Sequence, residues 1–360
     1  MKSLFILLIS ITTLSCSSEN TPENASTNET TNYQLSNNLN YNAVLQQIGT
    51  QKLGSAVEQP NSDGSLGRNK DGYFHVRFQM NMSRISDYAV VSENIQSLEA
   101  LLSTFTYAFN RQLNDGSFTL VIPDELLNSP SFTPPTQGDL VSGTAFFASS
   151  LGLALTTLEN SGWYTQGTET QTLREEIRKL HPKFEKTLDY LIVNKDILNQ
   201  VDANAPNRLL FNALAFYTLG NYLSRNDAVQ IAREFIATAL AQTDTTQGYF
   251  IEGGGWDSSY NGVAIKLALE LYLITTDNSL KNMLREPIIK ATLWQLSRIK
   301  VNGEISTEGN TRVFPGGEAF LGVEKGVDYV KTIKALYYFG HLTQLQSVIA
   351  TGDKVLNFYN

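Results

Sequence analysis

The sequence predicts an all-α fold in which two kinds of helix alternate along the chain and form two concentric layers. Three observations predict it. Apolar residues recur at the spacing of a helix, the connections between helices alternate between short and long, and a weak glycine-containing repeat marks the long connections. With 42% hydrophobic and 17% charged residues, the chain of 360 residues has a globular composition and the length that such a fold needs.

Four segments are apolar nearly all round. In the clearest of them, Val263, Leu267 and Leu271 recur at helical spacing. A helix of this kind is buried on most sides, so we expect these segments to form the inner layer. They are residues 142–158, 207–223, 260–275 and 326–342.

Four other segments carry a polar face and are expected to form the outer layer. Pro182 lies inside one of them and predicts a kink or two shorter helices. Asn226-Asp227 and Asp277-Asn278-Ser279 are typical N-cap signals and predict where two of these helices begin. The segments are residues 86–113, 170–198, 227–242 and 280–300.

The connections alternate in length. The turn from an apolar to a polar helix is short, whereas the return is usually long and rich in Gly and Pro. The long returns are residues 114–138, 243–258 and 301–325, and residues 199–206 are the exception. This alternation is what an α/α toroid produces, with short turns on one face and long loops on the other. Because function tends to reside on long loops held by a rigid scaffold, we expect the site on the long-loop face.

The long loops share a polar–Gly–x–apolar pattern. Glycine permits the left-handed turn that follows a helix, and the apolar residue anchors the loop on the barrel. The spacing fits four or five helical hairpins arranged around an incomplete ring, with residues 38–86 as an irregular N-terminal portion. The copies begin at Asp71, Asp115, Gln247 and Asn302.

One copy, Gln112-x-x-Asp115-Gly116-Ser117-Phe118, is similar to the QW repeat of terpene cyclases, with Phe in place of Trp. Over residues 87–345 the architecture resembles the α/α-toroid proteins, a superfamily that includes alginate and chondroitin lyases, several glycosidases and the cyclases. The sequence has no convincing acidic cyclase motif. The resemblance implies a carbohydrate-active protein with its cleft at the loop ends that enter the inner helices.

Composition limits the other classes. The formal net charge is -8, from 27 basic and 35 acidic residues, which argues against a nucleic-acid partner. One cysteine and three histidines exclude a disulfide framework and disfavour a zinc or His-rich metal site. Scattered residues such as Asp244 are compatible with Ca²⁺, but no EF-hand-like spacing indicates it. We therefore predict no metal and no cofactor.

The N-terminal residues predict where the protein is located in the cell. Residues 1–16, MKSLFILLISITTLSC, have a charged start and a short apolar run, and they end in a cysteine that resembles a bacterial lipobox. This implies cleavage before Cys16, lipidation of Cys16 and anchoring in the outer membrane of a Gram-negative bacterium; an ordinary secreted protein is the alternative. Residues 17–37 are polar and predict a disordered tether. The folded domain is expected over residues 38–360.

Three stretches of the long-loop face carry candidate site residues. The first, residues 248–262, contains three consecutive glycines that let a backbone approach a ligand; its alternative interpretation is a capped helix start. The second, residues 306–318, is alternatively an exposed loop. The third enters the helix at 207–223, where an arginine needs a partner or a ligand; the alternative is a pair with Asp257 or Glu252. The candidates are Tyr249, Glu252, Trp256, Asp257, Tyr260 and Asn261, then Arg312 and Glu318, then Asn207 and Arg208, together with His75, the one histidine expected on this face.

The resemblance favours a polysaccharide lyase that cleaves uronate-containing glycans by β-elimination. It implies Tyr260 as base and acid, with Arg208, Arg312 and Asn207 binding the substrate carboxylate. The Asn-Asn-His motif of the alginate lyases is absent.

Two alternatives stay open. A glycoside hydrolase would use paired carboxylates from among Glu252, Asp257 and Glu318. A non-catalytic glycan-binding lipoprotein would need only aromatic platforms such as Trp256 and Tyr249.

Overall fold

The computed structural model describes residues 33–130, 132–320 and 323–360. The predicted signal peptide, Cys16 and most of the predicted tether lie outside these residues, so the lipid anchor stays a prediction. The compact unit begins at Gln34. Leu35 is buried, and its carbonyl accepts a hydrogen bond from the hydroxyl of Tyr272. The compact unit therefore includes a few residues before position 38.

The regular secondary structure of the described chain consists of helices and one short antiparallel hairpin. This confirms the predicted all-α class. The elements in chain order are α1 (Tyr41–Ile48), α2 (Thr50–Ser55), the 3₁₀ helix η1 (Val76–Gln79), α3 (Met82–Ser92), α4 (Ile95–Phe109), α5 (Asp124–Leu127), α6 (Gln137–Glu159), α7 (Gly162–Gln166), α8 (Gln171–Lys179), α9 (His181–Val193), α10 (Lys195–Val201), α11 (Pro206–Tyr222), α12 (Asn226–Leu240), α13 (Ser258–Ile274), α14 (Asn278–Ser297), β1 (Ala319–Phe320), β2 (Val323–Glu324), α15 (Tyr329–Thr343) and α16 (Gln346–Tyr359).

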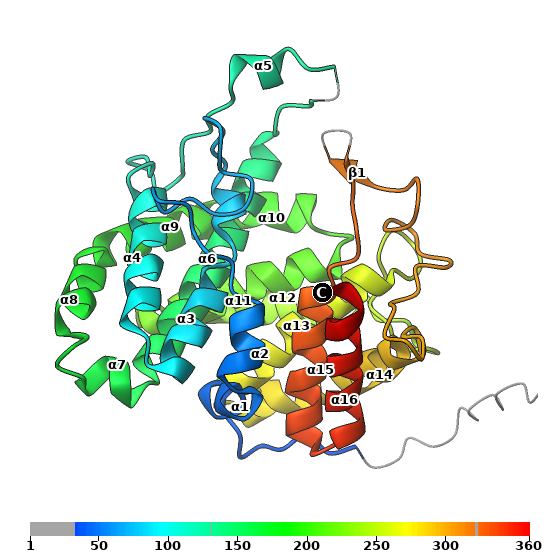
Figure 1. The fold of residues 1–360 in the computed structure, drawn as a ribbon. Helices are drawn as coiled ribbons and strands as arrows, with labels where there is room; N and C mark the ends of the chain where they lie inside the picture. The colour runs from blue at the N-terminus through cyan, green and yellow to red at the C-terminus, as the bar shows by residue number, and fades with distance from the viewer. Residues whose placement is uncertain (1–32, 131, 321–322) are drawn as a thin grey trace, which may run out of the picture. The chain divides into compact units, whose positions relative to one another are not determined.

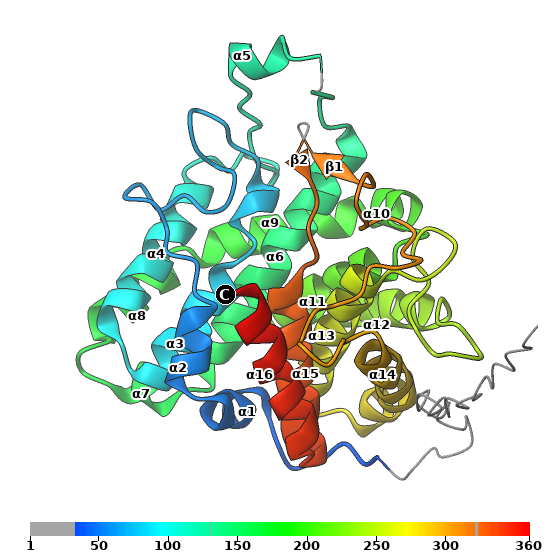
Figure 2. The same ribbon diagram turned by 45° about the vertical axis from the view of Figure 1, so that its right-hand side comes forward.

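The helices form two concentric rings (Figures 1 and 2). The inner ring runs α1, α3, α6, α11, α13 and α15, each packed on the next, and α1 packs against α15. The outer helices α4, α12 and α16 each cover one inner helix, whereas α9 packs on both α6 and α11, and α14 packs on both α13 and α15. The α/α toroid is thus confirmed, and α1 closes the ring more fully than the sequence predicted. All four segments predicted to be inner helices are inner helices, and most of their residues are buried.

Two of the predicted outer helices are broken. Residues 86–113 were expected as one helix, but the chain forms α3 and α4. Glu93 adopts the left-handed region at φ 49°, and the side chain of Asn94 caps α4 by accepting from the backbone N–H of Ser97. The segment around Pro182 is interrupted as predicted, because this proline stands in the first turn of α9.

The repeated turns fix the loops to the outer ring. Gly116 and Gly303 have φ of 88° and 95°, and a Cβ on either would lie within 2.3 Å of a backbone carbonyl, that of Lys186 or Lys354 on an outer helix. Glycine is required there for both conformation and space. The apolar residue of each copy is buried; these residues are Phe74, Phe118, Phe250 and Ile305. The repeat is therefore a packing motif of the ring.

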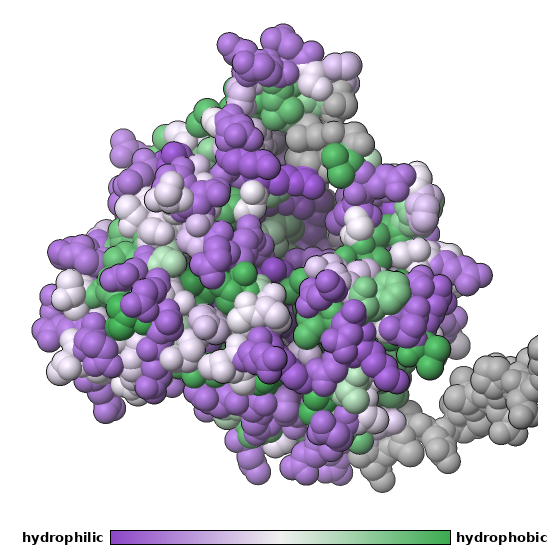
Figure 3. All heavy atoms as spheres, in the orientation of Figure 1, coloured by the Kyte–Doolittle hydropathy of each residue, from purple (hydrophilic) through white to green (hydrophobic). Residues whose placement is uncertain are grey.

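The long connections gather at the end where α6, α11, α13 and α15 begin. There α5 and the β1–β2 hairpin stand above the ring (Figure 1), and the surface between them is hollowed and lined largely by hydrophilic side chains (Figure 3). Among the described residues, α6 alone is long and apolar enough to cross a membrane, and 89% of that stretch is buried inside the protein. Such burial is what a helix of the inner ring requires.

Candidate functional site

Tyr260 stands in the first turn of α13, at the long-loop end of the ring. Its hydroxyl donates a hydrogen bond to Glu318 Oε2 at 2.7 Å and contacts the ammonium of Lys325. Lys325 Nζ lies 4.1 Å from the ring centroid of Tyr260, and the guanidinium of Arg312 lies 4.5 Å from it. Two cations thus flank one phenol ring, whose hydroxyl is held between a carboxylate and an amine.

Arg312 joins two carboxylates. Its Nη1 pairs with Glu252, and its Nη2 lies 3.2 Å from Glu318 Oε2. Glu252 belongs to a tight turn through Gly253 and Gly254, which both have positive φ. The structure therefore brings together four of the predicted catalytic residues: Tyr260, Glu252, Arg312 and Glu318.

Asp257, which the sequence suggested as a catalytic residue, has a structural role here. Its Oδ1 caps α13 by accepting from the backbone N–H groups of Ser259 and Tyr260. Its Oδ2 accepts from the backbone N–H groups of Arg312 and Val313, at 3.0 and 2.7 Å. The side chain is fully buried, so both oxygens are used to hold the Arg312 loop against the start of α13.

Asn261 likewise serves the fold. It is fully buried, and its Oδ1 accepts from the backbone N–H of Phe250. Its Nδ2 donates to the side chain of Gln295 and to the carbonyl of Ala291. The polar atoms of Asn261 thus tie the loop to α14, and its role in substrate binding stays a prediction.

The aromatic residues form a stack beside the charged group. The ring of Tyr249 lies 5.0 Å from that of Trp294 and 6.1 Å from that of Trp256, centroid to centroid. Tyr249 is 7% exposed, whereas Trp256 is partly exposed and packs against Gly309. Of the two predicted platforms, Trp256 is the one that a ligand can reach.

Two further arginines lie near Tyr260 and Lys325. They are Arg208 on α11 and Arg77 on η1. Arg208 Nη1 lies 3.3 Å from Asp202 Oδ1, so its partner is neither Asp257 nor Glu252 as the sequence suggested. The guanidinium of Arg77 lies 4.8 Å from the ring centroid of Phe146. Burial and the neighbouring Arg208 lower the pKa of Arg77. No carboxylate in the described part of the chain lies within ion-pair distance of Arg77.

His75 and Asn207 accompany these arginines but are themselves buried. His75 Nδ1 accepts from the backbone N–H of Arg77, and burial, reinforced by the Arg77 charge, lowers the pKa of His75 to about 4. The imidazole is therefore neutral near pH 7 and caps η1, and its role in substrate binding stays a prediction. Asn207 is 6% exposed, and its Oδ1 has no hydrogen-bond partner among the described residues.

The titration behaviour of the group depends on burial and pairing. Burial raises the pKa of Tyr260, and its bond to Glu318 raises it further, which is the opposite of what a tyrosinate base needs. Burial also raises the pKa of Glu252 against the opposing effect of Arg312. Burial alone would raise the pKa of Glu318, but the Tyr260 hydrogen bond and nearby cations outweigh it and lower that pKa.

Lys325 belongs to this charged group, but the sequence pattern did not single it out. Burial lowers its pKa to about 8, and its side chain remains 36% exposed. An amine with that pKa exists partly as the free base near neutral pH. Its place between a long loop and an inner helix was a signal, but no motif around it distinguished it from a surface lysine.

Metal ligation finds no support in this region. No group of three or more His, Cys, Asp or Glu side chains that could hold a metal ion occurs within residues 33–130, 132–320 and 323–360. The absence of a cofactor stays a prediction.

No model of a known protein family and no curated protein sequence matches the chain. Among solved structures, the crystal structure of D-mannose isomerase aligns with 88% of this chain and 87% of its own, at 10% sequence identity and a TM-score of 0.49. A likeness at that level transfers neither residues nor activity.

Proposed function

We propose that this protein is a carbohydrate-active enzyme that cleaves uronate-containing polysaccharides by β-elimination. The observation that carries the proposal is the contact between the Tyr260 hydroxyl and the Lys325 amine, close to the guanidiniums of Arg77 and Arg208. A proton-transfer pair beside carboxylate-binding cations is what this reaction requires.

The arginines would bind the uronate carboxylate. Arg77 lacks an ion-pair partner in the described chain, and Arg208 has one partner and a side chain that is 24% exposed. When a base removes the proton next to the carboxylate, negative charge develops on the carboxylate oxygens as an enolate. Guanidinium groups placed in advance stabilise that charge. Arg312 is already engaged by two carboxylates, so it orients Tyr260 and Glu318 instead.

Lys325 would be the base and Tyr260 the acid. The free amine of Lys325 takes the proton from C5, the electron pair forms the C4–C5 double bond, and the bond from C4 to the bridging oxygen breaks. Tyr260 gives its proton to the leaving oxygen. The ammonium of Lys325 then returns a proton to the Tyr260 phenolate through their direct contact, so that both groups end in their starting states. This assignment differs from a tyrosinate base and agrees with the raised pKa of Tyr260.

A glycoside hydrolase is the second candidate. The pKa of Glu252 is raised and that of Glu318 is lowered, and carboxylates with divergent pKa values are typical of an acid–base pair. However, the side chain of Glu252 is only 3% exposed and pairs with Arg312. A sugar could reach it only if Arg312 moved, which makes this candidate the weaker one.

The test incubates the full chain with a panel of uronate-containing and neutral polysaccharides, and follows the ultraviolet absorbance of unsaturated products together with reducing ends. Lys325→Met and Tyr260→Phe are each expected to lower the rate by about 10²–10⁴-fold. Lys290→Met on outer helix α14 and Tyr222→Phe at the far end of α11 are the matched controls. For the unmodified protein, kcat/KM should rise with pH towards about 8, because Lys325 must lose its proton.

The outcomes separate the candidates. Both signals rising together would support the lyase. Reducing ends without absorbance would support the hydrolase and shift the test to Glu252→Gln. Binding without either signal would support a non-catalytic glycan-binding protein.

We also propose that the protein is anchored to the outer membrane through Cys16, as the lipobox-like sequence suggests. Incorporation of labelled palmitate by the full chain, and its loss in Cys16→Ser, is the expected result. Release of the unchanged protein into the soluble fraction would contradict it.

A further inference from the structure

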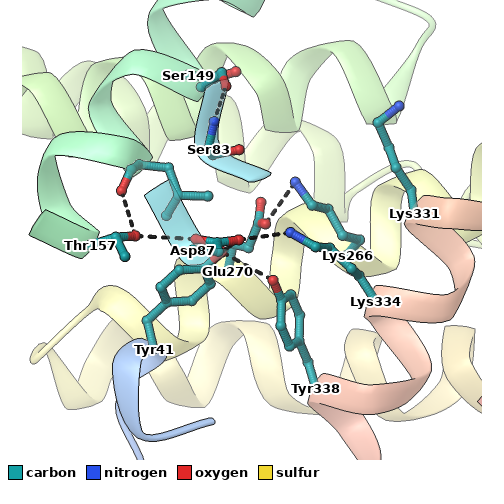
Figure 4. Close-up of polar contacts among 12 residues, drawn as sticks. Tyr41, Ser83, Asp87, Ser149, Thr157, Lys266, Glu270, Lys331, Lys334 and Tyr338 are labelled. Carbon is teal, nitrogen blue, oxygen red and sulfur yellow. Dashed lines mark hydrogen bonds and ion pairs between the residues drawn. The ribbon is translucent and has the colours of Figure 1, made fainter. Parts of the chain in front are cut away.

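A second group of charges lies deeper in the inner ring. Lys266 Nζ is 2.7 Å from Glu270 Oε1, and Lys334 Nζ is 2.7 Å from Asp87 Oδ2 (Figure 4). Lys266 follows Tyr260 by six residues on α13, which places it about 9 Å further along the helix. Asp87 and Glu270 are fully buried. This group is separate from the candidate site and is made by regular helices.

The charges in this part of the ring do not balance. Besides the two lysine pairs, Lys331 pairs with Asp328, and Arg84 on α3 carries a further positive charge. Within the described ranges, the guanidinium of Arg84 has no hydrogen bond and no ion pair. One positive charge is therefore left without a partner. Arg84 is partly buried, and its guanidinium lies with three lysines around one cavity, so a counter-ion held there would offset the repulsion among the four cations.

A cavity lies where these cations meet. It is lined by Arg84, Lys266, Lys331 and Lys334, and by the serines Ser149 and Ser150, with no carboxylate residue among its lining residues. Its volume of about 20 Å³ is enough for one particle the size of a water molecule. The hydroxyl of Ser149 already donates to the carbonyl of Phe146, whereas that of Ser150 only accepts, from the backbone N–H of Ser83. Four cations and the Ser150 hydroxyl around so small a space favour an anion and exclude a sugar or a phosphate.

We propose that this cavity binds a single small monovalent anion of the size of chloride, held by the ammonium and guanidinium groups that line it. The anion takes no part in glycan chemistry. It supplies the missing negative charge where α3, α13 and α15 meet, so it stabilises the inner ring. The inference is independent of the proposed function.

The first test places the ion directly. Crystals of the full chain grown in sodium bromide are examined by anomalous scattering at the bromine edge. A peak inside the cavity, near Arg84 and Lys266, is expected. Peaks only at exposed residues, or none at all, would overturn the proposal. That outcome would mean that charge balance is reached by loss of a proton, for which Lys266, whose pKa burial lowers to about 8, is the group available.

The second test measures stability in solution. Thermal unfolding is followed in sodium chloride and in sodium gluconate at equal ionic strength, because gluconate is too large for the cavity. The midpoint is expected to be higher in chloride and to rise with its concentration. Equal midpoints in the two salts would also overturn the proposal.

Substitutions locate the effect. Arg84→Met should raise the chloride concentration needed for half of the stabilisation by about tenfold, through loss of a charge-assisted hydrogen bond. Arg178→Met on the exposed face of α8 is the control and should retain the chloride effect. If Arg84→Met does not fold, the bromide map of the unmodified protein decides.

Discussion

The same three chemical groups occur twice in this ring. At the loop end, a carboxylate (Glu318) accepts from the Tyr260 hydroxyl and lies near the ammonium of Lys325. In the centre, Asp87 accepts from the Tyr41 hydroxyl at 3.1 Å and pairs with Lys334. The side chains of Lys325 and Glu318 are 36% and 32% exposed, whereas those of Lys334 and Asp87 are 6% and 0% exposed. Groups carried by loops remain accessible to a ligand, and the same groups carried by packed helices connect α1, α3 and α15.

The largest expected effect is the loss of the central carboxylate. Asp87→Ala leaves Lys334 as an unpaired buried charge, so we expect the free energy of unfolding to fall by about 3–5 kcal/mol. Glu318→Ala removes a partly exposed carboxylate and should cost about 1 kcal/mol or less. Urea unfolding monitored by circular dichroism measures both.

Asp87→Asn serves as the shape control, because its amide can still accept from Tyr41 while the charge is gone. It should fall between the unmodified protein and Asp87→Ala. Similar losses for Asp87→Ala and Glu318→Ala would show that burial does not separate the two groups.

The next largest effect concerns His75, which is buried. Its folded pKa of about 4 lies below its usual value of about 6.5. The unfolded chain therefore takes up a proton before the folded protein does, and stability that is present above pH 6.5 is lost as the pH falls towards 4. The shift corresponds to about 3 kcal/mol.

His75→Asn tests this pH dependence, because the amide oxygen can accept from the Arg77 N–H without titrating. Unfolding free energies measured at pH 7 and pH 4.5 should differ less in the variant than in the unmodified protein. An unchanged pH dependence would rule out His75 as its source.

The sequence allowed the scaffold to be predicted, because the scaffold depends on local patterns. Asp257 as the cap of α13, the buried inner helices and the glycine turn at Gly116 all follow from neighbouring residues. Contacts between residues that are far apart in the sequence do not follow from local patterns. The second pair of hydrogen bonds of Asp257 reaches a loop 55 residues away, and Asp87 and Lys334 are 247 residues apart.

The candidate site was predicted in part for the same reason. Four of the predicted catalytic residues meet because the long loops end at one face, which the alternation of connections indicated. Their neighbour Lys325 carries no local signature. The shift of its pKa arises from burial and from the charges of residues on other segments, which one sequence does not reveal.

Packing between inner helices should have an intermediate effect. A Cβ on Gly152 of α6 would lie 1.9 Å from Thr218 Oγ1 on α11. Gly152→Ala should therefore lower the free energy of unfolding by about 1–3 kcal/mol, because the two helices would have to separate. Thr218→Ala in the same chain should restore part of the loss. Gly162→Ala, whose Cβ would meet nothing within 4 Å, is the matched control.

The smallest expected effect sharpens the comparison, because it separates the number of ion pairs from their burial. Arg225 pairs with both Asp189 and Asp227 at 2.7 Å, yet its side chain is 36% exposed and lies on the short-turn face. Lys334 has one carboxylate partner and is 6% exposed. If burial sets the energy, Arg225→Ala should change the free energy of unfolding by about 0.2–1 kcal/mol, and the change should shrink in 1 M salt. Lys334→Ala should cost several times more at either salt concentration, since it leaves Asp87 charged in the centre of the ring. A larger loss for Arg225→Ala than for Lys334→Ala would mean that the exposed ion pairs of Arg225 stabilise the ring more than the buried contacts of Asp87 with Tyr41 and Lys334.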